Sequence, residues 1–284
     1  MAPFISFFGF DAALMSPSTL SQTRLRLAGA DMLEGLRQWR IWWILALTEI
    51  KQRYRRSSLG QFWLTLSMAA TIAGIGITFG VIFNQPLGSY IPFLGVGLIV
   101  WGLIAGLVND LSTAFISSEA YLSAYPGPRS IVIFRAIARN LVLAAHNLVL
   151  IPILWIIFGV EVTWAVLLVI PGLALITLNS IWVGMLFGPL CTRFRDLPQL
   201  ISNVVQLAFF LTPVMFRPAQ IQDKLWVLTH LNPFASFLEL VRAPMLGSIP
   251  DLSHYILALV FTLIGFAVAV PFYARFRGRI VYWL

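Results

Sequence analysis

Six long apolar stretches restrict this 284-residue chain to an α-helical protein embedded in a membrane. Each stretch reaches or approaches the roughly 20 residues that a helix needs to cross about 30 Å of hydrocarbon. Charged residues make up only 11% of the chain, whereas a soluble domain has about 25%. We therefore predict an all-α, polytopic membrane protein with six transmembrane helices. The predicted spans are 61–83, 90–109, 131–158, 164–190, 199–216 and 252–274.

The basic residues lie almost entirely on one side of the predicted spans. If the N-terminus is cytoplasmic, all 19 Lys and Arg except Arg217, Lys224 and Arg242 fall at or beside the inner surface. The positive-inside rule requires this asymmetry, and the opposite orientation would violate it at every inner loop. Both termini are therefore predicted to be cytoplasmic. Attraction to anionic inner-leaflet lipids explains the net charge of +8, so we expect membrane lipids as partners and no nucleic acid.

The chain divides into three predicted segments. Residues 1–32 form an N-terminal extension that we expect to be poorly ordered. Residues 33–59 form an amphipathic helix at the membrane interface, because apolar residues recur there at spacings of three and four. Tryptophan and arginine occur together in this segment, and both side chains suit the headgroup layer. The remaining segment, 60–284, carries the six spans.

Two segments between the spans are predicted to form short helices that do not cross. In the inner segment, Pro126 and Pro128 end any helix, which leaves a short one over about 112–124. Such a helix is either a docking site for another protein or a solvated connector. The outer segment, 217–251, contains apolar runs too short to cross and several prolines. It is predicted to be a pair of re-entrant helices beside an exit path, either covered by protein or lining a cavity.

Few polar residues lie within the spans. Arg135 and Arg139 share one face of the third span, where they either snorkel to the inner surface or face a cavity that accepts a charged group. His146 lies deeper, and we interpret it as a hydrogen-bonded structural residue because a proton relay would need a second ionisable group. The sequence contains no P-loop, no metal-binding motif and no nucleophile motif. We therefore predict no catalytic residues, no metal site and no enzyme activity, and energy for transport must come from a partner chain or an ion gradient.

Several short motifs, in this order and on six spans, resemble the membrane-spanning subunit of type-2 ABC exporters for O-antigen, capsule and teichoic acid. The resemblance covers about 33–284, and the tail favours O-antigen. The motifs are IKQRYRRSSLGQFW at Ile50–Trp63, YPGPR at Tyr125–Arg129, LTPVMF at Leu211–Phe216, LNPF at Leu231–Phe234, LVR at Leu240–Arg242 and RIVYWL at Arg279–Leu284.

This resemblance implies a subunit arrangement and a location. The chain would form a homodimer in the bacterial inner membrane and would bind two copies of a separate ABC ATPase. ATP and Mg would be bound by the ATPase, and this chain would hold no cofactor. The short inner helix would be the coupling helix that docks on the ATPase, with Glu119, Tyr121 and Leu122 as its contact residues.

The resemblance also implies a substrate, namely a polysaccharide linked to undecaprenyl pyrophosphate. Aromatic rings suit a channel for such a polymer because they stack on sugar faces, and cations near the inner surface would bind the pyrophosphate. The candidate channel aromatics are Phe79, Tyr90, Trp101, Phe209 and Phe210. The candidate pyrophosphate ligands are Arg53, Arg55, Arg56 and Arg139.

Other functions stay open at this point. The same architecture would serve a capsule or teichoic acid exporter, or an ABC permease for a drug or a lipid. An ion-coupled secondary transporter would need a buried coupling site, for which the sequence offers only His146. A membrane-embedded glycosyl transferase would need a cluster of carboxylates or histidines at one surface, and the sequence predicts none.

Overall fold

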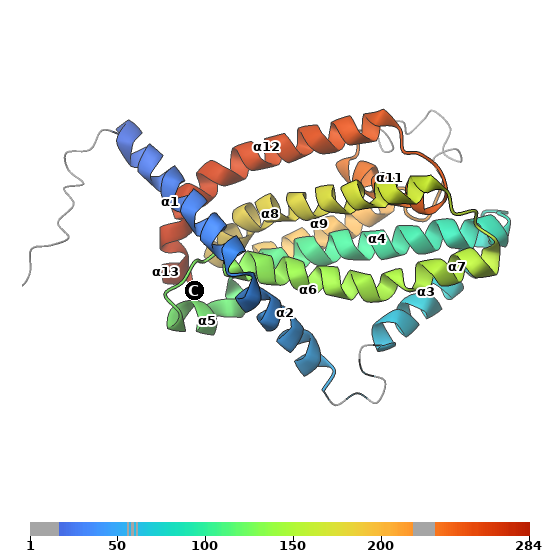
Figure 1. Cartoon of the computed structure of the whole chain (residues 1–284), viewed down its shortest axis with the longest axis horizontal. Helices are drawn as coiled ribbons and strands as arrows, with labels where there is room; N and C mark the ends of the chain where they lie inside the picture. The colour runs from blue at the N-terminus through green and yellow to red at the C-terminus, as the bar shows by residue number, and fades with distance from the viewer. Residues whose placement is uncertain (1–16, 56, 58–59, 61, 218–230) are drawn as a thin grey trace, which may run out of the picture.

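The computed structural model describes residues 17–55, 57, 60, 62–217 and 231–284, which form a bundle of helices with no strand in these ranges (Figure 1). Five helical segments are long and apolar enough to cross a membrane. They confirm the all-α polytopic fold and five of the six predicted spans. The segments are α3 (Phe62–Ile82), α4 (Leu87–Thr113), α6 with α7 (Ile131–Leu148 and Leu150–Phe158), η2 with α8 (Trp164–Leu168 and Val169–Arg193), and α12 with η5 and α13 (Leu252–Phe276, Arg277–Arg279 and Ile280–Trp283).

The predicted fifth span, 199–216, is a shorter helix than expected. It forms α9 (Leu197–Leu211), whose 15 residues extend about 22 Å at the rise of an α-helix. The helix ends because Thr212 precedes Pro213 and adopts an extended backbone with φ −96° and ψ 140°. Contacts fix both ends of α9. Just before the helix, the Arg195 guanidinium donates to the carbonyl of Leu284, and at its end the Asn232 side chain donates to the carbonyl of Leu211.

Helix α4 is the centre of the bundle, and 78% of the residues in its most apolar 18-residue stretch are buried. Helices α3, α6, α8, α9 and α11 (Pro233–Met245) all pack against it. Small residues permit this packing. A Cβ atom at Gly184 of α8 would lie 2.7 Å from Ile133, and one at Gly188 would lie 2.6 Å from the Phe115 ring. The glycines therefore serve helix packing within one subunit.

The third span is a pair of helices, and a proline explains the break. Pro152 has no amide hydrogen to donate to the carbonyl of Leu148, four residues before it. Accordingly α6 ends at Leu148 and α7 begins at Leu150. His146, near this break, bonds through Nδ1 with the carbonyl of Val142 at 2.7 Å, and its own carbonyl accepts from Thr65. The predicted hydrogen bonding of His146 is confirmed, and its structural role stays a prediction.

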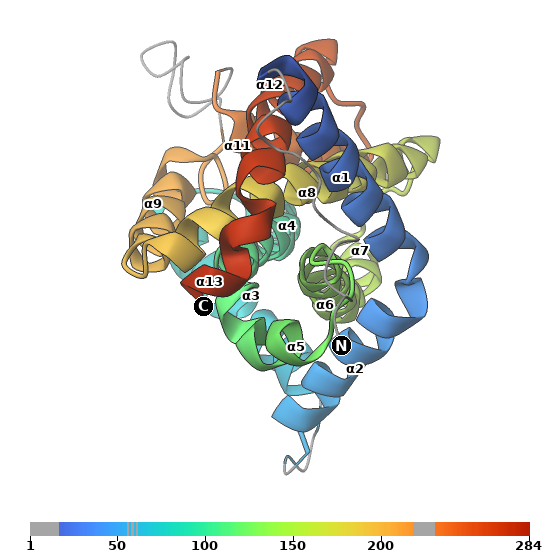
Figure 2. The ribbon, with the colours of Figure 1, turned by 90° about the vertical axis from the view of Figure 1, so that its left-hand side faces the viewer.

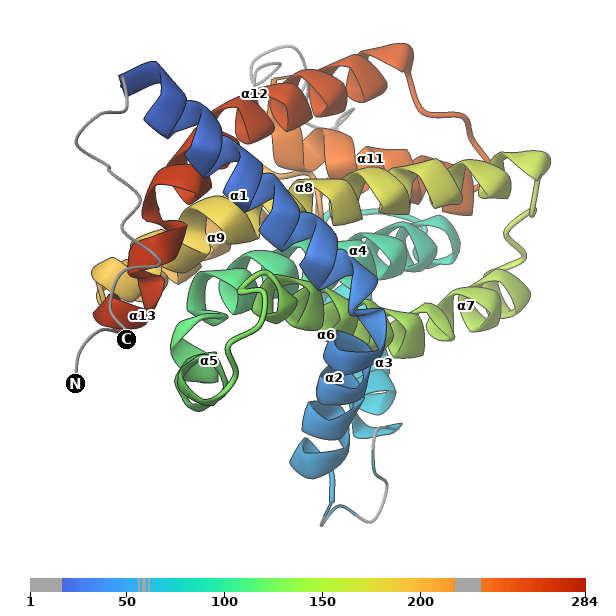
Figure 3. The same cartoon turned by 60° about the vertical axis from the view of Figure 1, so that its left-hand side comes forward.

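The N-terminal region differs from its prediction. Helix α1 (Pro17–Arg37) includes half of the extension that we expected to be poorly ordered, and residues 1–16 lie outside the described ranges. The predicted interfacial helix is divided at Gln38 between α1 and α2 (Trp39–Arg53). Tertiary contacts account for the order of α1, because it crosses and packs against α12 and buries Ala28 and Asp31 (Figure 3).

The short inner helix is present and is smaller than predicted. Helix α4 continues to Thr113, and it is followed by η1 (Ile116–Ser118) and α5 (Glu119–Ala124). Helix α5 lies beside α13 at the end of the bundle that also carries the junction of α1 and α2 (Figure 2). Of the predicted re-entrant pair, α11 is buried among α4, α8 and α12, whereas the other member falls within 218–230, outside the described residues.

Candidate functional site

Helix α9 carries a polar stripe on the side that faces away from the bundle. Its buried residues, Val205 and Ala208, define the inner face. The opposite face shows exposed side chains at spacings of four, three and four, which place them in one row along the helix. We call this row the amide stripe; it consists of Gln199, Asn203, Gln206 and Phe210.

Helix α3 has a comparable row. Its buried residues are Ile72, Gly76 and Gly80. Only 17% of the residues in its most apolar 18-residue stretch are buried. The opposite face presents small and hydroxyl-bearing residues, two of which donate to backbone carbonyls one turn earlier. We call this row the hydroxyl stripe; it consists of Ser67, Thr71, Gly74 and Thr78, all exposed.

The two stripes leave polar side chains exposed on two helices that the sequence predicts to cross the membrane. Both α3 and α9 pack on α4 and leave their stripes uncovered. A side-chain amide in hydrocarbon loses its hydrogen bonds to water, at a cost of several kcal/mol without compensation. Polar residues in spans consequently face a bundle interior or a water-filled cavity. This arrangement suits an aqueous passage bordered by α3 and α9.

The five predicted channel aromatics separate into two groups. Tyr90 is fully buried and its hydroxyl donates to the carbonyl of Met215 at 2.6 Å. Trp101 is 7% exposed and lies against Phe209 and Phe234, with ring centroids less than 6 Å apart. Both therefore pack inside the subunit.

The other three are more accessible. Phe79 and Phe209 are half-buried, and Phe210 is 63% exposed. Of the five, only Phe210 belongs to the amide stripe.

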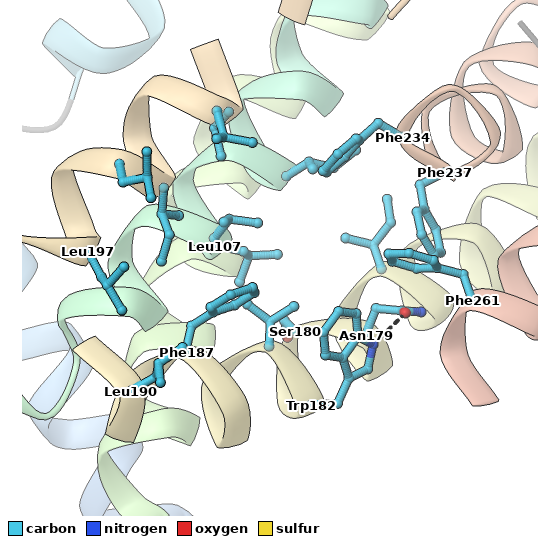
Figure 4. Close-up of a pocket in the computed structure, with 18 residues that line it drawn as sticks. Leu107, Asn179, Ser180, Trp182, Phe187, Leu190, Leu197, Phe234, Phe237 and Phe261 are labelled. Carbon is cyan, nitrogen blue, oxygen red and sulfur yellow. Dashed lines mark hydrogen bonds between the residues drawn. The ribbon is translucent and has the colours of Figure 1, made fainter. Parts of the chain in front are cut away.

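An apolar cavity of about 360 Å³ lies behind α9, among α4, α8, α11 and α12 (Figure 4). Aromatic and aliphatic side chains form most of its wall, including Phe187, Phe234 and Phe261. Its few polar groups are engaged, since the Trp182 indole donates to Asn179 at 2.7 Å and Asn179 donates to Thr262 at 2.7 Å. The cavity therefore offers little hydrogen bonding to a sugar.

The two arginines of the third span are held in a charged cluster near the start of α6. Arg135 and Arg139 pair with opposite oxygens of Glu49 on α2, at 2.8 and 2.7 Å. Arg139 also pairs with Asp110 on α4 at 2.6 Å, and Asn140 donates to the same carboxylate oxygen. The cluster contains two cations and two carboxylates, so it joins α2, α4 and α6 without net charge.

The predicted pyrophosphate ligands therefore have unlike surroundings. Arg139 is largely neutralised by its two carboxylates, whereas Arg53 and Arg55 are exposed. Arg56 lies outside the described residues. A polar cavity of about 350 Å³ connects the two environments, and Glu49, Arg53, Tyr54, Ser117 and Arg139 contribute to its wall.

The predicted coupling residues also differ in exposure. Glu119 is exposed, Tyr121 is half-buried and Leu122 is only 8% exposed. The rings of Tyr121 and Tyr125 lie 5.4 Å apart, and Tyr125 is exposed. Burial raises the pKa of the Tyr121 hydroxyl, which stays a hydrogen-bond donor at neutral pH.

Sequence reasoning missed several residues that organise this region. The carboxylates of Glu49 and Asp110 were not recognised as partners of the arginines, although acidic residues beside spans are rare enough here to attract notice: the whole chain has 11. The amide stripe was missed too, and its helical spacing was available in the sequence. In the described parts of the chain, no cluster of three or more His, Cys, Asp or Glu could hold a metal ion.

Comparison with known proteins places the chain in a family. The profile of the ABC-2 type transporter family matches residues 40–246. The chain is 28% identical over 202 residues to the O-antigen export system permease protein RfbA of Myxococcus xanthus, covering 70% of this chain and 77% of the relative. It is 22% identical over 237 residues to the protein of that name in Klebsiella pneumoniae, with 79% and 89% covered. Over 234 residues it is 26% identical to the polysialic acid transport protein KpsM of Escherichia coli, with 81% and 90% covered.

Proposed function

This multi-pass membrane protein belongs to the ABC-2 type transporter family, and from that premise we propose that it is the membrane subunit of a polysaccharide exporter. Membership confirms the resemblance found in the sequence and makes the chain a transport subunit. The matched relatives are named for O-antigen export and polysialic acid transport, and both cargoes are polysaccharides. The proposed cargo is a polysaccharide carried on undecaprenyl pyrophosphate, with O-antigen ahead of capsule or teichoic acid.

The amide stripe is the observation that carries the proposal. Side-chain amides both donate and accept hydrogen bonds, so they match the hydroxyl groups that every sugar presents. Phe210 adds an exposed aromatic face at the outer end of the stripe. Such a surface can pass successive sugars without requiring one sequence. A drug or lipid permease would favour an apolar path, and the apolar cavity lies on the opposite side of α9.

The uncovered stripes also support a homodimer. An aqueous passage at membrane depth must be enclosed by protein, because lipid cannot satisfy the polar groups that border it. A second copy of the chain, facing α3 and α9 of the first, would supply the missing wall. Six crossings fit this arrangement, with α9 as a short fifth span that is followed by the turn at Thr212–Val214.

Helix α5 is the proposed contact with the ATPase. Glu119 and Tyr125 present accessible side chains, and Tyr121 is accessible in part. Leu122 points into the subunit, so its role is to anchor the helix. Two ATPase copies, carrying ATP and Mg, would bind the two α5 helices of the dimer.

The exposed basic residues at the end of α2 are the proposed site for the pyrophosphate of the carrier. Arg53 lines the polar cavity and is free of the carboxylates that neutralise Arg139. Charge-assisted hydrogen bonds from guanidinium groups to phosphate are short and strong. Arg53 and Arg55 would bind the headgroup, and Arg139 would shape the cavity wall.

Co-purification with the ABC ATPase of the same bacterium tests the subunit role. We expect a stable complex with the unaltered chain and its loss in Glu119→Arg, whereas Glu161→Arg, an exposed residue in the loop after α7, should leave it intact. Absence of any complex with the unaltered chain would refute the exporter.

The cargo is tested by deleting the gene that encodes this chain from the bacterium. We expect polysaccharide to disappear from the cell surface and lipid-linked polymer to accumulate inside. Analysis of the accumulated polymer separates O-antigen from capsule and teichoic acid. Unchanged surface polysaccharide would rule out all three.

A further inference from the structure

Asp31 on α1 is a buried carboxylate that binds two separate parts of the chain. Its side chain is only 2% exposed. The backbone amides of Arg129 and Ser130 donate to it at 3.0 and 3.2 Å. The Tyr273 hydroxyl donates at 2.8 Å, and the Arg277 guanidinium forms an ion pair with it at 2.9 Å. Four donors thus satisfy a charge whose burial would otherwise be costly.

The two parts bound by Asp31 are the connection after α5 and the inner end of the last span. Arg129 and Ser130 end the connection from α5 to α6, while Tyr273 and Arg277 lie at the end of α12 and the start of η5. Further contacts close the junction: the Ser130 hydroxyl donates to the Asp31 carbonyl at 2.7 Å, and the Arg129 guanidinium donates to the Arg277 carbonyl.

Glycine at position 35 allows α1 to approach this closely. A Cβ atom at Gly35 would lie 2.1 Å from the Ser130 hydroxyl oxygen, a distance that no side chain can occupy. Asp31 and Gly35 are one turn apart and therefore lie on the same face of α1. On the face of α1 that meets the α5–α6 connection, Asp31 therefore supplies a carboxylate, and Gly35, which has no side chain, allows close contact.

Helix α5 needs such external support. It has six residues, too few for an isolated helix to be stable in water. Its position depends on the segments that flank it and on α13, which packs beside it. Asp31 secures the downstream flank directly to the last span. Three of the residues at this junction, Asp31, Tyr273 and Arg277, lie outside the range matched by the family profile.

We propose that Asp31 is a positioning residue that links α5 to α12, so that displacement of α5 is transmitted to the last span. The inference rests on the proposed role of α5 as the ATPase contact. Without Asp31, α5 would still present Glu119 to an ATPase, but its movement would be taken up by the connection at Arg129 and Ser130. ATP hydrolysis would then continue while export fell.

The functional test compares Asp31→Asn with Glu34→Gln in the complete complex with the ATPase. Glu34 is an exposed carboxylate three residues further along α1, so it controls for charge loss on that helix. For Asp31→Asn we expect complex assembly and ATP hydrolysis near the level of the unaltered protein. Export per ATP should fall about tenfold, a common size for coupling between two sites. Glu34→Gln should resemble the unaltered protein.

Tyr273→Phe removes a single donor and keeps the carboxylate charged and paired, which covers the case in which Asp31→Asn does not accumulate. We expect export per ATP to fall by about twofold to threefold, consistent with one hydrogen bond. Equal losses of export and ATP hydrolysis in these variants would show that Asp31 contributes to general stability, which would overturn the proposal. Unchanged export per ATP would overturn it too.

A structural measurement needs neither ATPase nor cargo. Spin labels at Ser123 of α5 and Arg275 of α12, both exposed, report the distance between the two elements in a Cys191→Ala background. We expect one narrow distance distribution in the unaltered chain and a broad one in Asp31→Asn. An equally narrow distribution in the variant would overturn the link. If no ATPase binds the unaltered chain, the exporter proposal fails, whereas this distance measurement still judges the link by itself.

Discussion

The charged cluster on α2, α4 and α6 and the amide stripe on α9 are both polar surfaces on membrane helices, yet they are built in opposite ways. In the cluster, each charged group of Glu49, Asp110, Arg135 and Arg139 lies within 2.8 Å of an opposite charge. In the stripe, Gln199 donates a 3.1 Å hydrogen bond to Asn203 and the Phe210 ring lies against Phe209, while the side chains stay exposed. Groups that satisfy one another hold helices together, whereas groups left uncovered are available to a passing ligand. From this difference we propose a structural role for the cluster and a role in transport for the stripe.

Replacing the shared carboxylate of the cluster should have the largest effect. In Glu49→Gln, two arginines lose a common partner, and we expect stability to fall by about 2 kcal/mol. Breaking a fully buried pair costs roughly 3–5 kcal/mol, and Glu49 is 29% exposed. Thermal unfolding in detergent should show a drop of several degrees, with Glu34→Gln as the control. An unchanged midpoint would contradict a structural role for the cluster.

Removing amides from the stripe should affect export and leave stability intact. For the double variant Asn203→Leu with Gln206→Leu we expect export to fall about tenfold, since two neutral hydrogen bonds at roughly 0.7 kcal/mol each together correspond to that factor. Val204→Leu, exposed on α9 but off the stripe, should export normally. The measurement is surface polysaccharide at matched protein levels. Normal export by the double variant would show that the stripe does not line the passage.

An internal polar group offers a third case, because it is buried and satisfied like the cluster but uncharged. Asn179→Leu deprives the Trp182 indole of its acceptor and the Thr262 hydroxyl of one of its two partners, and we expect a loss of about 1 kcal/mol of stability. Unfolding in detergent should detect it, with export per folded molecule unchanged. A selective export defect would instead indicate that the apolar cavity belongs to the passage.

The aromatic end of the stripe should show the smallest effect. Phe210→Ala should lower export about threefold, within the roughly 0.5–1.5 kcal/mol typical of aromatic contacts, and Phe210→Trp should restore it. Phe209→Ala is the matched comparison. Its ring packs on Trp101, so it should lower the unfolding temperature and leave export per folded molecule unchanged. The reverse pattern would exchange the two roles.

Much of the fold was predictable because hydrophobic length is a local property. Five spans and the short inner helix follow from apolar stretches and prolines, which act within a few residues of their own position. Pro213 and Pro152 also act locally, so the early end of α9 and the break between α6 and α7 could have been predicted from the sequence. The candidate site was less predictable: of the five aromatics, Tyr90 and Trp101 turned out to be buried, since an aromatic residue in a span has the same local pattern whether it packs or faces a passage.

The sequence by itself determined that this chain is a polytopic membrane protein, and its motifs pointed to the family; the inner location of its basic residues stays a prediction. Only the tertiary structure decided which polar groups are satisfied inside the subunit. Arg139 meets Glu49 across 90 positions of sequence, and Asp31 meets Tyr273 across 242. No periodicity connects residues so far apart, because their proximity depends on the packing of whole helices. Burial and pairing are properties of the folded chain, and they separate the residues that hold this protein together from those that remain free to act on a substrate.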